Sequence, residues 1–287
     1  MSGLDLVAVR ALLQMTLEED LGARGDVTSL ACVPASAQLD VAFISRQDGV
    51  VAGLPVLSAL VAEVGLPASS LSLVASDGAR VSPGTVLATL SAPARSVLAM
   101  ERTALNLLGH LCGVATATRA WVDAIEGTGA RVRDTRKTMP LLRSLEKYAV
   151  RCGGGTNHRA GLDDAVLIKD NHVAAAGGVG AALDAAYAAY PRGSMVVQVE
   201  VDSLAQLEEA LAHGAEQVLL DNFGVDQLAR AVALVRRTTE GVVLEASGGL
   251  TLASARQYAE TGVNYLAVGA LTHSAPSLDI GLDVLVP

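Results

Sequence analysis

From about residue 115 onward, the sequence alternates between short apolar runs and stretches with helical spacing. The apolar runs lie near residues 130–134, 165–169, 195–201, 217–220, 242–245 and 265–268. A typical intervening stretch carries Leu204, Leu207 and Leu211, which are three and four residues apart and share one helical face. A repeat of about 20 to 35 residues is typical of β/α units around a parallel sheet. This pattern restricts the fold class to α/β.

Polar residues follow one apolar run after another, as at Asp134–Lys137, Lys169–His172 and Ser247–Gly249. In a (β/α) barrel the C-terminal ends of the strands meet at one rim, where active sites are built. The polar run ends therefore favour an open (β/α) barrel with its site at that rim. A doubly wound parallel sheet has the same repeat and stays the alternative.

The first part of the chain has a different organisation. Val9, Leu12, Leu13 and Leu17 form an apolar stripe that predicts a helix over residues 1 to about 22. Short alternating runs broken by Gly and Pro then predict a small β-rich domain over about 38–92. Leu105, Leu108 and Leu111 indicate a following helix. We expect an N-terminal domain over 1–114, a barrel over 115–274, and a C-terminal tail over 275–287 that returns to the N-terminal domain.

A basic segment between Arg131 and His172 stands out in an acidic protein. Its 42 residues hold nine Lys/Arg and five Asp/Glu, a formal charge of +4, so the rest of the −9 chain carries −13. A local cationic cluster of this kind indicates a focused site for a small anion rich in carboxylate or phosphate. The acidic balance and 3% aromatic content argue against a nucleic-acid or anionic-membrane surface.

The cysteines and the apolar segments bear on the compartment. Cys32, Cys112 and Cys152 lack metal-ligand spacing, which favours structural thiols in a reducing environment. The N-terminus lacks a signal-peptide pattern, and the uncharged run at 103–118 is typical of a buried helix. We therefore expect a cytoplasmic protein with no membrane or nucleic-acid partner.

Within the basic segment, the candidate site cations lie at or near run ends. Arg136, Lys137, Arg159 and Lys169 suit carboxylate and pyrophosphate groups. Lys169 closes an apolar run, so it needs an anion or a covalent role. By contrast, three cations spaced four apart on a predicted helix fit a solvated face, with at least two at the surface; they are Arg143, Lys147 and Arg151.

Four carboxylates end apolar runs or follow them directly. Glu200 and Asp221 would hold a divalent cation or ribose hydroxyls, because Mg²⁺ commonly takes one or two carboxylates plus substrate phosphates. A structural ion pair between one of them and a neighbouring lysine is the alternative. Asp170 and Glu245 either belong to the site or orient its lysines.

Histidines and glycine turns complete the candidate set. His158 and His172 are either proton-transfer groups or hydrogen-bonded structural groups, whereas His110 fits a helix core and His213 a helix end at the surface. Glycine turns follow the last two apolar runs, where barrels often bind phosphate through backbone N–H groups. The predicted phosphate-binding residues are Ser247, Gly248, Gly249, Gly269, Ala270 and His273.

Several of these strings together resemble the quinolinate phosphoribosyltransferases, also called nicotinate-nucleotide pyrophosphorylases (carboxylating). The matching strings are ERTALNLLGH (101–110), RDTRKT (133–138), EKYAVRCGGGTNHR (146–159), LIKDNH (167–172), VEVDS (199–203), LLDNF (219–223), EASGGL (245–250) and VGALTHS (268–274). The resemblance implies an N-terminal α/β sandwich domain, a C-terminal open α/β barrel and a homodimer. It also implies transfer from 5-phosphoribosyl-1-pyrophosphate to quinolinate with Mg²⁺, giving nicotinate mononucleotide, pyrophosphate and CO₂ in de novo NAD synthesis.

The resemblance also implies a role for each matching residue. Quinolinate would be held by Thr135, Arg136, His158, Arg159 and Lys169, with Arg102 contributed by the neighbouring subunit of the dimer or of a higher oligomer. Lys137 would engage the pyrophosphate-bearing substrate. Glu200 and Asp221 would lie at the ribose hydroxyls and at Mg²⁺, bound directly or through water. The 5-phosphate would lie at the two glycine turns and His273. Lys137, Lys169, Glu200 and Asp221 are the predicted catalytic residues.

Three rival interpretations stay open at this point. A Schiff-base aldolase could use Lys169, because such enzymes place a lysine on a barrel strand. A phosphoribosyltransferase for a monocarboxylate such as nicotinate would need fewer cations than this chain offers. A non-catalytic barrel that binds an anionic metabolite would bind without turnover.

Overall fold

The computed structural model describes residues 4–239 and 241–285, and the chain forms two compact units. The first unit contains the residues up to Arg119, then Thr138–Gly154, and the residues from Leu271 onward. The second unit contains Ala120–Lys137 and Gly155–Ala270. The boundaries expected from the sequence, at 114/115 and 274/275, stay a prediction. No described helix is long and apolar enough to cross a membrane.

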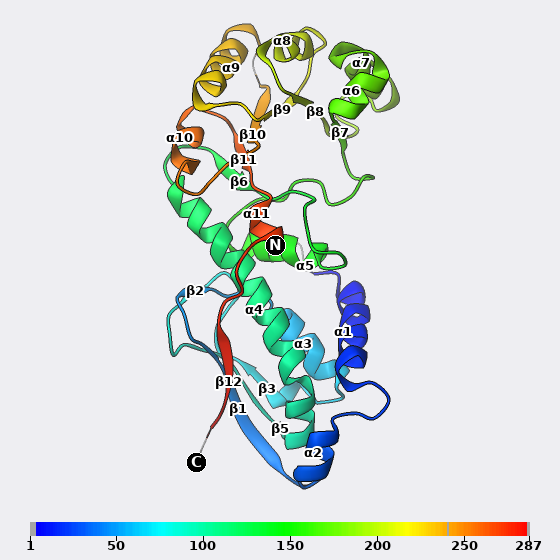
Figure 1. The fold of residues 1–287 in the computed structure, drawn as a ribbon, viewed down its shortest axis with the longest axis vertical. Helices are drawn as coiled ribbons and strands as arrows, with labels where there is room; N and C mark the ends of the chain where they lie inside the picture. The colour runs from blue at the N-terminus through cyan, green and yellow to red at the C-terminus, as the bar shows by residue number, and fades with distance from the viewer. Residues whose placement is uncertain (1–3, 240, 286–287) are drawn as a thin grey trace. The chain divides into compact units, whose positions relative to one another are not determined.

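The first unit is built on an antiparallel sheet with helices beside it (Figure 1). The sheet order is β12-β1-β5-β3, and β2 pairs with β4 in a separate two-stranded sheet. Ser45 lies opposite Ile280, so the last strand pairs along the first. The strands are β1 (Gln38–Ser45), β2 (Gly49–Val50), β3 (Leu71–Leu73), β4 (Arg80–Val81), β5 (Val86–Pro93) and β12 (Ile280–Val284).

The helices of this part pack apolar stripes that are visible in the sequence. They are α1 (Leu6–Leu21), α2 (Val27–Cys32), α3 (Leu54–Glu63), a 3₁₀ turn (Ala68–Ser70), α4 (Ala94–Ala124), α5 (Arg143–Cys152) and α11 (Ala270–His273). Asp5 caps α1 by accepting hydrogen bonds from the N–H groups of Val7 and Ala8, and Leu13 is fully buried. The predicted first helix is therefore confirmed.

One element of this unit was not expected. Within the segment 38–92, which was expected to be β-rich, β2 ends at Val50 and helix α3 begins at Leu54. Proline in the first turn favours a helix start, and Leu57, Leu60 and Val61 share one buried face. The β-rich description of residues 38–92 was therefore incomplete.

The cations of helix α5 also differ from expectation. Lys147 is only 4% exposed, so the prediction of a solvated face was wrong for this residue, while Arg143 and Arg151 are half-buried. Most of α5 is buried, including Glu146, which accepts a hydrogen bond from His110 Nε2 on helix α4 at 2.8 Å. A helix enclosed on most of its faces has no solvated side for three cations at a spacing of four.

The second unit contains the predicted parallel sheet. Its order is β6-β11-β10-β9-β8-β7, and every adjacent pair is parallel. The strands are β6 (Arg131–Arg133), β7 (Val166–Ile168), β8 (Val197–Val201), β9 (Gln217–Asp221), β10 (Val243–Ser247) and β11 (Tyr265–Ala267). All six predicted apolar runs are strands, and this confirms the β/α repeat.

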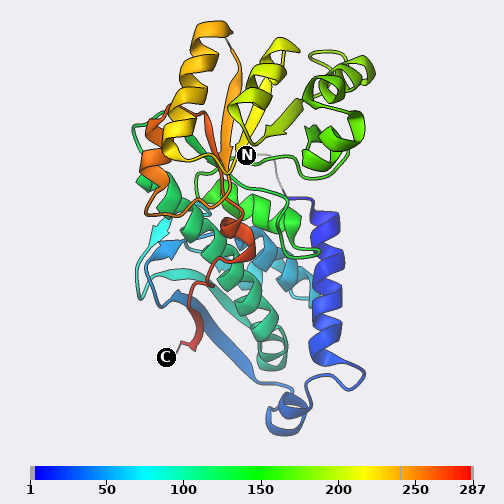
Figure 2. The ribbon, with the colours of Figure 1, turned by 45° about the horizontal axis from the view of Figure 1, so that its top comes forward.

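Helices follow the strands and cover the sheet from outside, as Figures 1 and 2 show. They are α6 (Asp170–Ala176), α7 (Val179–Ala189), α8 (Leu204–Ala212), α9 (Val225–Thr238) and α10 (Ala255–Glu260). Strands β6 and β7 form the two edges, so the barrel is open between them. Thr156 continues from the β6 edge, because its N–H donates to Val132 O and its carbonyl accepts from the N–H of Asp134. Open-barrel architecture, expected from the strand ends, is confirmed.

Candidate active site

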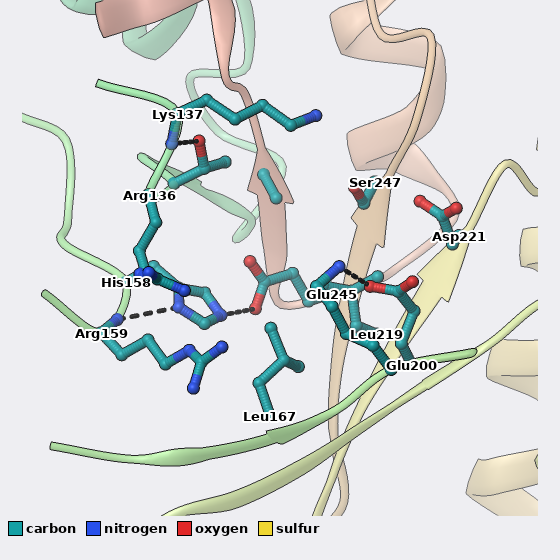
Figure 3. A pocket seen from close by; sticks show the side chains of 13 residues that line it. Arg136, Lys137, His158, Arg159, Leu167, Glu200, Leu219, Asp221, Glu245 and Ser247 are labelled. Atoms are coloured by element: carbon teal, nitrogen blue, oxygen red, sulfur yellow. Dashed lines mark hydrogen bonds and ion pairs between the residues drawn. The ribbon is translucent and has the colours of Figure 1, made fainter. Parts of the chain in front are cut away.

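The C-terminal ends of the barrel strands enclose a pocket of about 350 Å³ that lies entirely within the second unit (Figure 3). Arg136, Lys137 and Arg159 lie on one side, and Glu200 and Asp221 lie on the other (Figure 3). The lining residues are Thr135, Arg136, Lys137, His158, Arg159, Leu167, Lys169, Glu200, Leu219, Asp221, Glu245, Ser247 and Ala267. The convergence follows from the parallel sheet, since every strand delivers its last residues to the same rim.

Two guanidinium groups form the cationic side. Burial lowers the pKa of Arg159, and the positive charge of Arg136 lowers it further. Arg159 Nη1 donates to the carbonyl of Ala165 at 3.0 Å, while its buried Nε has no hydrogen-bond partner among the described residues. Arg159 stays cationic, since an arginine guanidinium is not deprotonated in proteins. The mutual repulsion of the two guanidiniums would be relieved by an anion bound beside them.

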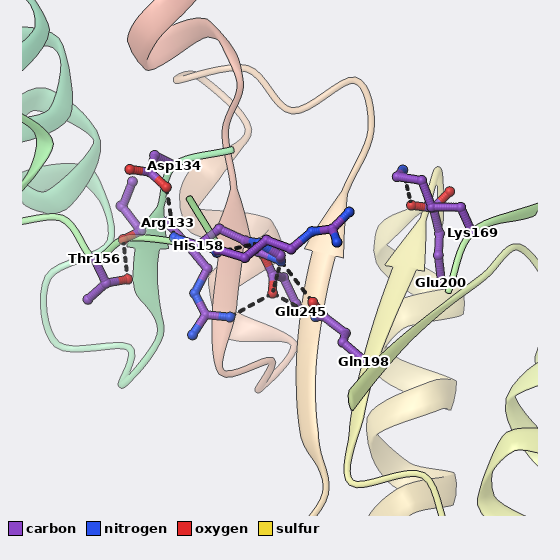
Figure 4. A network of polar contacts seen from close by, with 10 residues as sticks. Arg133, Asp134, Thr156, His158, Lys169, Gln198, Glu200 and Glu245 are labelled. Atoms are coloured by element: carbon purple, nitrogen blue, oxygen red, sulfur yellow. Dashed lines mark hydrogen bonds and ion pairs between the residues drawn. The ribbon is translucent and has the colours of Figure 1, made fainter. Parts of the chain in front are cut away.

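A lysine–carboxylate ion pair lies at the end of the neighbouring strands. Lys169 Nζ lies 2.6 Å from Glu200 Oε2, with the two side chains 45% and 14% exposed (Figure 4). The alternative raised for Glu200, an ion pair with a neighbouring lysine, is therefore present. Lys169 is thus paired with a carboxylate that lines the same pocket.

Strand β9 ends in a carboxylate residue and β10 ends in a hydroxyl residue, and a tight turn follows them. Asn222 donates its side-chain N–H to Asp221 Oδ2 at 2.7 Å and its backbone N–H to Ser247 O at 2.9 Å. Gly248 has φ +90°, and a Cβ there would lie 2.1 Å from Asn222 Oδ1. Only glycine fits this conformation and this space, so the turn after Ser247 is specified by backbone geometry.

Buried polar groups hold the segment that contains His158. Asp134, which is fully buried, accepts hydrogen bonds from Asn157 Nδ2 at 2.6 Å and from the backbone N–H of His158 at 2.7 Å. His158 Nε2 lies 2.8 Å from Gln198 Oε1. Gln198 donates in turn to Glu245, which also accepts from Arg133 (Figure 4). Glu245 therefore contacts an arginine and a glutamine and lines the pocket, so of its two alternatives the structure favours a place in the site over the orienting of a lysine.

Comparisons with known proteins agree with this geometry over the whole chain. The family models described as quinolinate phosphoribosyl transferase, N-terminal domain, and quinolinate phosphoribosyl transferase, C-terminal domain, match residues 26–112 and 114–283. The chain belongs to this family.

Individual relatives match this chain almost from end to end. A nicotinate-nucleotide pyrophosphorylase (carboxylating) from Mycobacterium leprae is 50% identical over 287 residues, 99% of this chain and 100% of that protein. A probable nicotinate-nucleotide pyrophosphorylase (carboxylating) from Bacillus subtilis is 40% identical over 96% of this chain and 93% of its own length. The solved nicotinate-nucleotide pyrophosphorylase from Francisella tularensis superposes with a TM-score of 0.91 at 34% identity, covering 99% and 98% of the two chains.

The structure brings most of the predicted site residues of this family member together. Those that line the pocket are Thr135, Arg136, Lys137, His158, Arg159, Lys169, Glu200, Asp221 and Ser247. Gly248 and Gly249 follow Ser247 directly, and Gly269 and Ala270 follow β11, but they are not among the lining residues. Arg102 and His273 belong to the first unit, where Arg102 is exposed on α4 and His273 ends α11.

Some contributors were missed or given an undecided role. Leu167, Leu219 and Ala267 line the pocket with apolar surface, and nothing in an apolar strand distinguishes them beforehand. Gln198 had a signal, because it is a polar residue inside the apolar run 195–201, and it is 2% exposed. His172 is exposed, and its Nδ1 accepts from the N–H of Lys169 at 2.9 Å, so it closes the first turn of α6.

Proposed function

We propose that this chain transfers a phosphoribosyl group from 5-phosphoribosyl-1-pyrophosphate to quinolinate with loss of CO₂. The observation that carries the proposal is the placement of Arg136 and Arg159 opposite Glu200 and Asp221 in one pocket. A pyridine dicarboxylate matches the two guanidiniums, because each planar fork can bind one carboxylate through two parallel hydrogen bonds. A donor with a ribose and several phosphates matches the carboxylate side and the turn at Ser247.

The bond changes that this reaction requires are balanced without a covalent enzyme intermediate. The anomeric carbon–oxygen bond breaks, and pyrophosphate leaves with the electron pair. The quinolinate nitrogen donates its lone pair to the anomeric carbon and becomes cationic. The bond between the ring and the 2-carboxylate then breaks, CO₂ departs, the bonding electron pair stays on the ring carbon, and a proton from solvent adds there.

The chain's own residues supply positioning and charge. Arg136 and Arg159 hold the acceptor, with His158 on their side of the pocket and Lys169 on the Glu200 side. Lys137 balances the charge that develops on the leaving pyrophosphate. Glu200 and Asp221 hold the ribose hydroxyls and favour positive charge at the anomeric carbon.

A magnesium ion fits the carboxylate side of this pocket. Within 4–239 and 241–285, no group of three or more His, Cys, Asp or Glu residues could hold a metal ion. Mg²⁺ commonly takes one or two protein carboxylates and completes its shell with substrate phosphates. Glu200 and Asp221, which both line the pocket, would hold it directly or through water. When bound, Mg²⁺ would neutralise charge on the pyrophosphate.

We further propose a cytoplasmic homodimer in which Arg102 reaches the partner's pocket. Arg102 is an exposed cation on helix α4, so it is available to a second copy. The cytoplasmic location is supported by Cys32, Cys112 and Cys152, all of which are free thiols. Sedimentation of the chain, together with mixing of Arg102→Ala subunits with Lys137→Ala subunits, tests the shared site. Recovery of activity in the mixture is expected, and its absence would contradict the shared site.

The deciding experiment incubates the purified chain with quinolinate, phosphoribosyl pyrophosphate and Mg²⁺. Nicotinate mononucleotide and CO₂ are expected in equal amounts, and EDTA is expected to abolish both. Product from nicotinate without CO₂ would instead indicate a monocarboxylate transferase. Tight binding of quinolinate without any product would indicate a non-catalytic barrel.

A further inference from the structure

Glu245 is fully buried at the centre of a hydrogen-bonded chain in the barrel interior (Figure 4). Its Oε2 accepts from Arg133 Nη1 at 2.9 Å and from Gln198 Nε2 at 2.8 Å. Gln198 Oε1 lies 2.8 Å from His158 Nε2, and His158 Nδ1 accepts from the backbone N–H of Arg159 at 2.8 Å. The chain of hydrogen bonds thus runs from a buried carboxylate to a residue of the proposed quinolinate site.

The direction of every hydrogen bond in this chain is determined by the carboxylate. A carboxylate only accepts, so the Gln198 amide must turn its NH₂ group toward Glu245 and its oxygen toward His158. An amide oxygen also only accepts, so His158 Nε2 must carry the hydrogen. His158 Nδ1 is then unprotonated and is able to accept from the N–H of Arg159.

The opposite orientation of the Gln198 amide would be unfavourable where His158 meets the backbone of Arg159. If Gln198 presented its NH₂ group to His158, the ring would carry its hydrogen on Nδ1. That hydrogen would face the backbone N–H of Arg159 across 2.8 Å, and two donors would oppose each other. The backbone of Arg159 would then have to move, and its guanidinium, now held on Ala165 O, would move with it.

We propose that Glu245 is a positioning residue that sets the His158 tautomer through Gln198 and thereby places Arg159 for the acceptor carboxylate. The assignment rests on the proposed function, because it explains the position of a residue expected to hold quinolinate. Glu245 acts here through its neighbours and does not itself bind the acceptor.

Glu245→Gln tests the proposal with almost no change in shape. The amide introduced at position 245 presents either its oxygen or its NH₂ group to Gln198, so the Gln198 amide loses its fixed direction and the Nδ1–H form of His158 becomes populated beside the Nε2–H form. The KM for quinolinate is expected to rise about tenfold, the size of one charge-assisted contact, whereas the KM for the donor changes by less than about twofold. ¹⁵N NMR of histidine-labelled protein, assigned with His158→Asn, reads the tautomer directly.

The double variant Gln198→Glu/Glu245→Gln is the matched rescue. The carboxylate introduced at position 198 accepts from His158 Nε2 and from the amide at position 245, so the original direction returns and the KM for quinolinate should recover. If Glu245→Gln folds poorly, Gln198→Met breaks the same chain of hydrogen bonds with a side chain of similar size. That variant should also lose the Nε2–H preference.

Three results would overturn the proposal. They are an Nδ1–H tautomer in the unmodified protein, an unchanged tautomer in Glu245→Gln, and an equal rise of both KM values. The NMR measurement needs no turnover. A chain that fails to use quinolinate but shows the predicted tautomer shift would therefore contradict the proposed function and leave the Glu245 control of His158 intact.

Discussion

Lys169 Nζ lies 2.6 Å from Glu200 Oε2, which joins the end of β7 to the end of β8 inside the pocket. Under the proposed function, the pair places a cation expected to bind an acceptor carboxylate beside a carboxylate expected to bind the ribose or the metal. Neither charge is deeply buried, since the two side chains are 45% and 14% exposed. An approaching carboxylate is therefore able to share the Lys169 ammonium without leaving Glu200 uncompensated in a dry interior.

Lys169→Met should lower the activity with quinolinate much more than it lowers the stability of the fold. Partly exposed ion pairs contribute about 0.2–1 kcal/mol, so the free energy of unfolding should change little. A charge-assisted contact with substrate is worth about 1.5–3 kcal/mol, so kcat/KM for quinolinate should fall about 10- to 100-fold. Urea unfolding and initial rates measure the two effects. A loss of stability as large as the loss of kcat/KM would contradict a substrate role.

Arg136→Ala and Arg159→Ala should weaken the acceptor far more than the donor. Each variant removes one guanidinium from the cationic side of the pocket, so the KM for quinolinate should rise about 10- to 100-fold. Arg256→Ala is the control, because Arg256 pairs with Glu260 on an exposed helix turn of the same unit. Rates with both substrates varied provide the measurement. A change in the donor KM alone would reverse the assignment of the two sides.

Gly248→Ala should damage the turn after β10. A left-handed conformation costs a non-glycine residue about 1–2 kcal/mol, and the added Cβ would also collide with the Asn222 side chain. Gly193→Ala isolates the first effect, because Gly193 has φ +81° and nothing within 4 Å of its Cβ position. The melting temperature of Gly248→Ala should be lower than that of Gly193→Ala, and only Gly248→Ala should have a higher KM for the donor. Equal melting temperatures would show that the collision is relieved.

The two buried thiols predict a stability change at high pH. Burial raises the pKa of Cys112 to about 12 and that of Cys152 to about 11, from an ordinary value of 9.0. The two thiols ionise at a higher pH in the folded state than in the unfolded state. Their contribution to stability is therefore fully present below pH 9 and is lost as pH rises toward 12. The free energy of unfolding should therefore fall more steeply above pH 9 than in a Cys112→Ala/Cys152→Ala variant. Parallel curves for the two proteins would contradict this.

Burial should also make the buried thiols less reactive toward a thiol reagent than the exposed one. At pH 8 a thiol reagent should modify the exposed Cys32 in the native protein, and all three cysteines only after unfolding. Cys112 is further shielded, because its Sγ exchanges hydrogen bonds with the backbone of Ala52 at 3.2 and 3.3 Å. Native modification of Cys112 would indicate an opening of the first unit.

Several elements could be predicted from the sequence because their signals are local. Strands β6 to β11 coincide with the six apolar runs, since a strand covered on both faces must be apolar along its length. The polar residues at their ends line one pocket because parallel strands end at the same edge. Helix α3 was missed although Pro55, Leu57 and Leu60 indicated it, because adjacent glycines and short apolar runs suggested strands.

The sequence by itself determined the repeat, the fold class and the identity of the pocket's charged residues. These depend on residue type and spacing along the chain. Tertiary structure alone decided which charges meet: Glu200 lies against Lys169, Lys147 is buried in α5, and Gln198 links Glu245 to His158. Such contacts join positions up to 112 residues apart, as for Arg133 and Glu245. The strand order and the pleat of the sheet determine which of these residues meet, and the local spacing of residues along the chain reveals neither.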